Sequence, residues 1–138
     1  MTSSEESTGS VGIRTAMLAD FAKVEKSGLI TIVGGGITKF GAATLPAPFN
    51  FYVVLQLTND AAIPVQRALA VEIRRPAGDS ALTINGELGL HPGHDLINIG
   101  LSLGTIVDMV GRWVVSVQVG EDEASTELGF IAELNPTA

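Results

Sequence analysis

Gly111-Arg-Trp-Val-Val-Ser-Val-Gln-Val-Gly120 is the stretch that decides the fold class. Trp113 and three alternate valines fall on one side of an extended chain, and mostly polar residues fall on the other. A strand with one buried face gives this period of two, and β-branched residues suit its pleated surface. Trp113 is the single tryptophan of the chain, so we expect its large apolar side chain at the centre of the core.

The same alternation recurs along the chain between turn signals. Inward rows of apolar residues are predicted within 49–57, 69–73, 82–90, 97–103 and 128–132, and 29–33 is a further strand. No amphipathic helix of ordinary length follows residue 25. Many short strands with one buried face each are typical of two packed sheets. The sequence therefore predicts an all-β, immunoglobulin-like β-sandwich of seven to nine strands with an N-terminal hairpin.

Three segments leave local alternatives open. Residues 14–24 fit a short helix or a strand, although the turn residues that follow favour a β-hairpin. Asn85-Gly86 suits a two-residue hairpin turn, yet Gly86 keeps the inward parity of its neighbours, so a bulge or kink within one strand fits nearly as well. Residues 91–94 are expected to form a loop, and 104–110 a connection into the Trp113 strand.

Length and composition fit one domain. The chain has 138 residues, of which 46% are apolar, and can bury a core without disulfides or metals. Its first residues are small, polar and acidic, with little to pack. We predict a disordered tail over 1–11, a single sandwich domain over 12–134 and a second tail over 135–138.

Charge and cysteine content exclude several classes of function. Without cysteine there is no disulfide, thiolate nucleophile or cysteine-bound zinc. A net charge of −7 repels nucleic acid and anionic membranes. The polar start is unlike a signal peptide, and no apolar run approaches the roughly 20 residues of a spanning helix. We expect a cytoplasmic protein, or one within a protein assembly, that binds a protein partner or its own copies.

Gly34-Gly35-Gly36 follows a predicted strand and resembles the start of a phosphate-binding loop. The dinucleotide fingerprint needs another glycine three residues later, opening a helix. Lys39 stands there, and two prolines follow before a helix could form. A bulge or a positive-φ turn is therefore the preferred interpretation. The three glycines remain candidates for an interaction loop, and no cofactor is predicted.

His91-Pro92-Gly93-His94-Asp95 is the one cluster of potential metal ligands in the sequence. Two imidazoles and a carboxylate could bind zinc, although the sequence names no further ligand. A solvated loop is the alternative. This cluster supports a second functional hypothesis, a metal-dependent enzyme or ligand-binding domain that uses His91, His94 and Asp95.

Tyr52, Val54 and Val114 occupy outward positions of their predicted strands. If these strands are neighbours in one sheet, its outer face is partly apolar, as at a subunit or partner surface. The alternative is a face that the N-terminal hairpin covers. The acidic turn 121–123 is interpreted as a solvated surface. The first functional hypothesis is thus a non-enzymatic interaction or assembly module, in a homo-oligomer or a larger particle.

Three motifs occur in order along the chain. They are Ala16-Met-Leu-Ala-Asp-Phe-Ala22, then Gly34–Gly36 followed by Leu45-Pro-Ala-Pro48, and finally Gly111-Arg112-Trp113. Together they resemble a family of small bacterial proteins classed as a domain of unknown function. The resemblance implies an immunoglobulin-like sandwich and supplies no catalytic residues. A tyrosine often holds a corner of such a strand through its hydroxyl. Because this chain has Trp113 instead, the corner is expected to be held by packing.

Overall fold

Nine β-strands follow one another through residues 10–135, the part of the chain that the computed structural model describes apart from the side chains of His94 and Asp95. No helix interrupts them there. The strands are β1 (Val11–Val24), β2 (Ile30–Gly35), β3 (Lys39–Ala42), β4 (Ala47–Asn59), β5 (Val65–Arg74), β6 (Ser80–Leu90), β7 (Gly93–Val107), β8 (Gly111–Val119) and β9 (Ala124–Leu134). Ser10 and Val11, which were predicted to lie in the tail, are both buried, and Val11 begins β1. The rest of that tail, residues 1–9, and residues 136–138 lie outside the described part.

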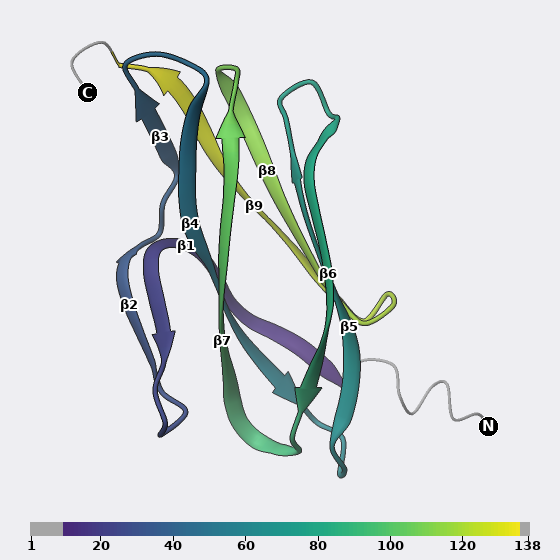
Figure 1. Cartoon of the computed structure of the whole chain (residues 1–138). Helices are drawn as coiled ribbons and strands as arrows, with labels where there is room; N and C mark the ends of the chain where they lie inside the picture. Colours follow the sequence, from purple (N-terminus) through teal and green to yellow (C-terminus); the bar gives the residue numbers. More distant parts are fainter. Residues whose placement is uncertain (1–9, 136–138) are drawn as a thin grey trace.

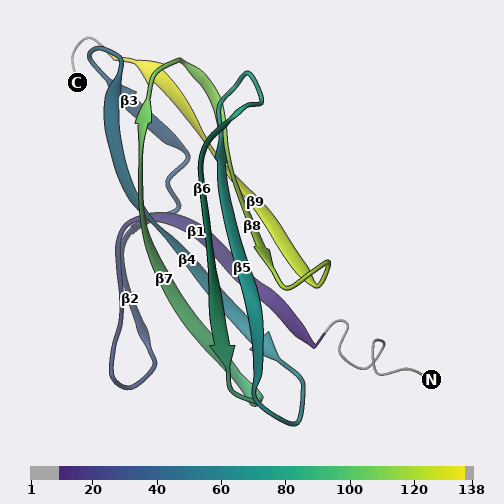
Figure 2. The ribbon, with the colours of Figure 1, turned by 45° about the vertical axis from the view of Figure 1, so that its right-hand side comes forward.

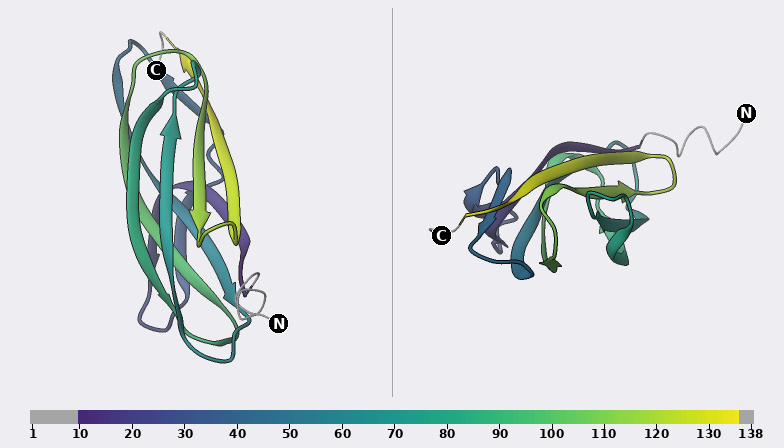
Figure 3. Two further views of the ribbon diagram at one scale, coloured as in Figure 1. Left: turned by 90° about the vertical axis from the view of Figure 1, so that its right-hand side faces the viewer. Right: turned by 90° about the horizontal axis from the view of Figure 1, so that it is seen from above.

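The strands form two sheets packed face to face (Figure 1). One sheet has the order β2-β1-β4-β7 and the other the order β3-β9-β8-β5-β6. Strand β3 is parallel to β9, and the other neighbouring pairs are antiparallel. Figure 2 and Figure 3 show the two layers from further directions. The order β1-β4-β7 matches strands A, B and E of an immunoglobulin sandwich, and β9-β8-β5-β6 matches G, F, C and C′. The predicted all-β sandwich is confirmed.

Trp113 lies at the centre of the core, as predicted, with no exposed surface. Its indole ring stacks on Phe130 of the neighbouring strand β9, with the ring centroids 5.9 Å apart and the planes 11° from parallel. The alternate valines of β8 and the inward residues of β4 are also buried. The period of two therefore identified the core face of both sheets.

The corner before β8 differs from the expectation. The indole Nε1–H of Trp113 donates a hydrogen bond of 3.1 Å to the backbone carbonyl of Met109. A buried N–H needs such a partner, and here it fixes the turn that leads into the strand. Packing alone does not hold this corner, because the indole N–H bonds backwards along the chain as a tyrosine hydroxyl would.

Residues 14–24 are a strand, and β1 and β2 form the predicted hairpin. The first half of β1 pairs with β4 as far as Ala19 opposite Tyr52, and the second half pairs with β2. Beyond Ala19 the hairpin bends back over the outer face of β4 and β7 (Figure 1). Two contacts mark its position there. A Cβ placed on Gly100 of β7 would lie 3.3 Å from the Cβ of Ala22, and Asn98 donates to the carbonyl of Gly28 at 2.8 Å.

Two further predictions are corrected. Asn85-Gly86 lies within one strand, β6, as the second alternative held, but its register with β5 is unbroken there, so it is neither a hairpin turn nor a bulge. Strand β7 begins at Gly93 and continues to Val107. The predicted loop at 91–94 is therefore shorter, and the connection to β8 contains only residues 108–110.

Candidate functional site

His91 lies in the short connection between β6 and β7 and is exposed. It lines a hollow of about 740 Å³ between the tip of the β1–β2 hairpin and the outer face of β4 and β7. The lining residues are Val24, Ser27, Gly28, Leu29, Gln56, His91, Leu96, Ile97 and Asn98. The amide of Gln56 donates to that of Asn98 at 3.0 Å, and Asn98 in turn holds Gly28. These amide bonds position the hairpin over the sheet.

Of the three predicted zinc ligands, the structure describes the side chain of His91 only. The backbone of His94 and Asp95 belongs to β7, but their side chains lie outside the description. Among the described side chains, no three histidine, aspartate or glutamate groups gather closely enough to hold a metal ion. The zinc site at His91, His94 and Asp95 stays a prediction.

Gly34, Gly35 and Gly36 lead the chain out of the hairpin towards β3 in the other sheet. Gly34 and Gly36 have φ angles of 63° and 85°, which favour glycine. The amides of Gly36 and Ile37 both donate to the carbonyl of Leu18, at 2.8 and 3.0 Å. Gly34 and Gly35 are the end of β2, and the positive φ that the sequence indicated is found at Gly34 and Gly36. The part of the three glycines in an interaction stays a prediction.

Tyr52, Val54 and Val114 do not form one exposed patch. Val114 lies in β8, whereas Tyr52 and Val54 lie in β4 of the other sheet. Val54 has no exposed surface, because Ala19 and Ala22 of the hairpin cover it. The predicted shared surface is wrong, and the alternative, a face covered by the N-terminal hairpin, is what the structure shows for β4.

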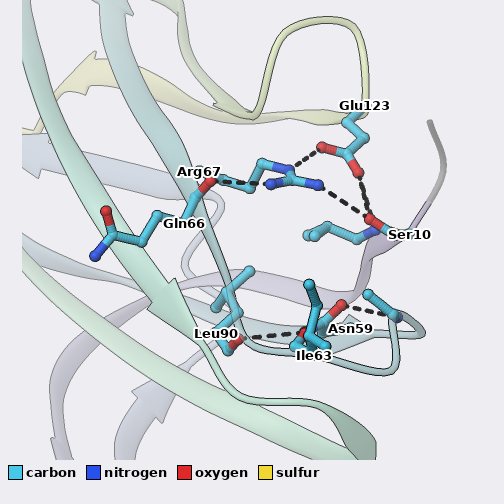
Figure 4. Close-up of polar contacts among 9 residues, drawn as sticks. Ser10, Asn59, Ile63, Gln66, Arg67, Leu90 and Glu123 are labelled. Atoms are coloured by element: carbon cyan, nitrogen blue, oxygen red, sulfur yellow. Dashed lines mark hydrogen bonds and ion pairs between the residues drawn. The ribbon is translucent and has the colours of Figure 1, made fainter. Parts of the chain in front are cut away.

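The acidic turn before β9 contains a buried carboxylate that the sequence did not reveal. The side chain of Glu123 is only 6% exposed and accepts a 2.5 Å bond from Arg67 Nε. Its second oxygen accepts bonds from the hydroxyl of Ser10 at 2.9 Å and the amide of Val11 at 3.2 Å (Figure 4). Burial raises the pKa of Glu123, but the bonds from Arg67, Ser10 and Val11 and the charge of Arg67 outweigh it and lower that pKa. A carboxylate held in this way is a poor general base for Ser10, and it ties the start of β1 to β5 and to the turn between β8 and β9.

Asn59 forms a second buried polar cluster near this turn (Figure 4). Its amide nitrogen donates to the carbonyls of Leu90 and Ile63, at 3.2 and 3.4 Å, and its oxygen accepts from the amide of Ala61 at 3.0 Å. These bonds close the turn after β4 and attach it to the end of β6. The cluster is structural, because the bonds engage both ends of the amide group.

A polar hollow of about 640 Å³ lies on the outer face of the five-stranded sheet. Arg74 crosses it between Glu72 and Glu127, at 3.0 and 2.9 Å. Hydrogen bonds to Glu127 and then to Glu72 raise the pKa of Arg74. Since both carboxylates already engage the guanidinium, this face offers no unpaired cation at Arg74 to an anionic ligand.

The side of the sandwich formed by β6 and β7 is open. Each of these strands is the last of its sheet, bonded within residues 10–135 only to β5 or to β4. Inward-facing apolar side chains along both edges are only partly covered, although the cross-strand neighbours of all but Leu88, which pairs with the half-buried Arg67, are buried. We call this set the β6–β7 seam: Leu82, Ile84, Leu88, Ile97, Ile99 and Leu101.

Apart from Leu88, the seam residues are more exposed than the residues they pair with on the neighbouring strands. Ile99 and Leu101 pair with Leu55 and Val53, which have no exposed surface, yet both are themselves only partly buried. On the other sheet, Ile84 pairs with the buried Val71 and is 37% exposed. The core thus reaches this edge without a strand to close it. The periodicity of the sequence could identify the inward residues, but not which strands end the sheets.

Comparisons with known proteins show the fold and little more. No model of a protein family matches the chain. No curated protein matches it either. Among solved structures, 88% of the chain superposes on part of a Bacteroides fragilis protein described as a beta-galactosidase, with 12% identity and a TM-score of 0.60. A beta-glucuronidase from glycoside hydrolase family 2 matches over 86% of the chain, with 10% identity and a TM-score of 0.56.

The chain covers only 17% and 12% of the lengths of these two solved proteins. It is therefore similar to one β-sandwich portion of much larger chains. At such low identity the likeness concerns the fold alone. As for membranes, the described residues contain no helix of sufficient length and apolar character to span a bilayer.

Proposed function

We propose that this chain is a non-catalytic β-sandwich module that works by associating with protein, and that the β6–β7 seam is its contact surface. The observation that carries the proposal is a hydrophobic core left partly open along two unpaired strand edges. Burying such apolar surface drives association, and unpaired strand backbone supplies hydrogen bonds to an added strand.

From Leu96 to Val107, the edge of β7 lacks the features that usually protect a strand from unwanted pairing. Natural edges are kept short, or carry lysine, proline or a bulge. From Leu96 to Val107 the sequence has neither a charged residue nor a proline. Its register with β4 is unbroken from Ile97 to Val107. An unprotected edge of this length is expected to have a partner strand.

Two other features support the proposal. Glu123 and Arg74, the carboxylate and guanidinium with shifted pKa values, are each engaged in ion pairs that position strands. The resemblance of 16–22, 34–36 and 111–113 to a bacterial family of unknown function likewise supplies no catalytic residues. The acidic charge suits a module that acts in the cytoplasm or within a protein assembly.

Site-specific photocrosslinking in the native cell tests this function. A Ser102→p-benzoylphenylalanine variant places the reactive group at an exposed position in the middle of β7. Ser125→p-benzoylphenylalanine is the matched control, on an exposed position of β9. We expect protein adducts from position 102 and few from position 125. Equal or absent labelling at the two positions contradicts a contact surface at β7.

A further inference from the structure

We infer that the partner at the β6–β7 seam is a second copy of this chain, bound on a two-fold axis so that β7 pairs antiparallel with its own copy. The inference rests on the proposed association function and names its partner. It would join the two four-stranded sheets into one sheet of eight strands, β2-β1-β4-β7 followed by the same order reversed.

Charge is the first reason to favour a second copy. When a strand pairs with itself, each charged residue approaches the same charge on the copy, and like charges opposite one another destabilise a sheet. A strand that binds a different protein can instead carry charges complementary to that partner. Charged residues make up 17% of this chain, so a segment as long as 96–107 would carry about two, but it carries none.

The pairing of side chains is the second reason. With the two-fold axis at Ser102, Leu101 lies opposite Leu103 of the second copy, and Ile97 lies opposite Val107. Apolar and β-branched pairs of this kind stabilise an antiparallel ladder. The same register sets Asp108 opposite Leu96 rather than opposite another acidic residue. All these inward residues point to the side of the sheet that contains the partly open core.

The available area agrees with a dimer of modest affinity. A strand pair over 96–107 is about 40 Å long, and the seam between two packed sheets adds about 15 Å of depth. Each copy then contributes roughly 600 Å², and the dimer buries roughly 1,200 Å², which is within the range of specific interfaces. The exposed Ile106, at the outer side of β7, would be covered as well.

Two other sheet ends are less suited to pairing with a copy. Strand β3 has four residues and begins with the exposed Lys39. Strand β2 has six residues and ends at Gly35, between two glycines with positive φ, Gly34 and Gly36. Both are short edges, of the kind that natural sheets use to avoid pairing. Strand β7 is the long, neutral edge.

Sedimentation of the purified full-length chain tests the inference. We expect a reversible monomer–dimer equilibrium at micromolar concentrations. Ser102→Lys places two ammonium groups beside the two-fold axis and should weaken the dimer at least tenfold. Ser102→Glu should do the same with two carboxylates. An equimolar mixture of the two variants should dimerise again, because opposite charges then meet at the axis. Ser125→Lys is the matched control and should leave the equilibrium unchanged.

Circular dichroism and thermal unfolding of each variant confirm that the monomer is folded. Ser102 is exposed on the outer face, so the substitutions remove no core contact. A wild-type chain that stays monomeric overturns the inference. So do open-ended oligomers, an unweakened dimer of the Ser102 variants, or a mixture that fails to pair. If the purified chain is monomeric while crosslinking at position 102 captures another protein, association stands and self-pairing falls.

Discussion

Glu123 is the residue whose environment departs furthest from what its sequence context suggests. It sits in a run of three acidic residues, yet it receives bonds from Arg67, Ser10 and Val11. The Ser10 and Arg67 partners lie 113 and 56 positions away in the chain. No local pattern could reveal them, which explains why the sequence predicted a solvated turn. Removing one partner of such a cluster leaves buried donors unsatisfied.

We predict that Glu123→Gln lowers the free energy of unfolding by about 1–3 kcal/mol at neutral pH, because the amide carries no charge to pair with Arg67 and keeps only one of the two acceptor oxygens that Arg67, Ser10 and Val11 share. The lowered pKa of Glu123 fixes the pH dependence. A carboxylate with a lowered folded-state pKa stabilises the fold above its ordinary value of 4.5, and this contribution is lost as the pH falls through the folded value. Denaturant unfolding should therefore show a difference between wild type and variant that shrinks below pH 4.5. Glu121→Gln, at an exposed neighbour, is the control, and a difference that persists unchanged in acid contradicts the mechanism.

Trp113 provides a second prediction at the scale of the residue. Trp113→Phe keeps an aromatic ring against Phe130 but removes the N–H that bonds Met109. The substitution leaves a small cavity and an unpaired carbonyl, so we expect a loss of about 2–4 kcal/mol in unfolding free energy. Chemical denaturation followed by far-ultraviolet circular dichroism measures it. A loss below about 0.5 kcal/mol would show that neither the hydrogen bond nor the indole volume matters.

At the scale of the element, the sequence predicted which segments are strands, but not which strands are neighbours in a sheet. The alternation of apolar residues marks 49–57 and 113–119 as inward rows, since a strand with one buried face requires it. Which strand ends a sheet depends on the whole topology. The length of β7 and the openness of the β6–β7 seam could not be predicted from periodicity. The candidate surface therefore emerged only from the strand order.

The β1–β2 hairpin is a second case in which the sequence predicted an element but not its position in the fold. The turn residues 26–28 predicted a hairpin, but its position over β4 and β7 depends on two small residues that meet. Ala22 lies against Gly100, where a side chain would press on the hairpin. Glycine and alanine usually weaken a strand, because they have little or no side chain to pack. Here they allow the hairpin to approach the sheet closely.

We predict that Gly100→Val displaces the hairpin from the sheet, because the new side chain would meet Ala22. Hydrogen exchange should become at least tenfold faster for the amides of 22–32, while those of β8 keep their protection. Gly89→Val is the matched control, since a Cβ at Gly89 meets nothing within 4 Å. Unchanged exchange in 22–32 would mean that the hairpin does not depend on this contact.

The segment around His91 supports a prediction about metal. The described side chains contain no group of three potential metal ligands. We expect no stoichiometric zinc binding in isothermal titration at neutral pH, and the same result for His94→Ala. Tight uptake by the wild type that the variant loses would favour the metal-dependent alternative over an association module.

At the scale of the whole molecule, the net charge of −7 opposes the association of two copies, although the edge of β7 that would join them is uncharged from residue 96 to 107. Two copies repel one another at long range, whereas the proposed interface itself contains no charge pair from 96–107. Salt shortens the Debye length from about 30 Å at 0.01 M to about 8 Å at 0.15 M, so it screens the repulsion and leaves the apolar contact intact. We predict that self-association tightens several-fold over this range, measured as the dissociation constant in sedimentation equilibrium. An interface built on opposite charges would weaken instead, because salt would screen its attraction. The direction of the salt effect therefore distinguishes pairing through the neutral strand from docking through the charged faces.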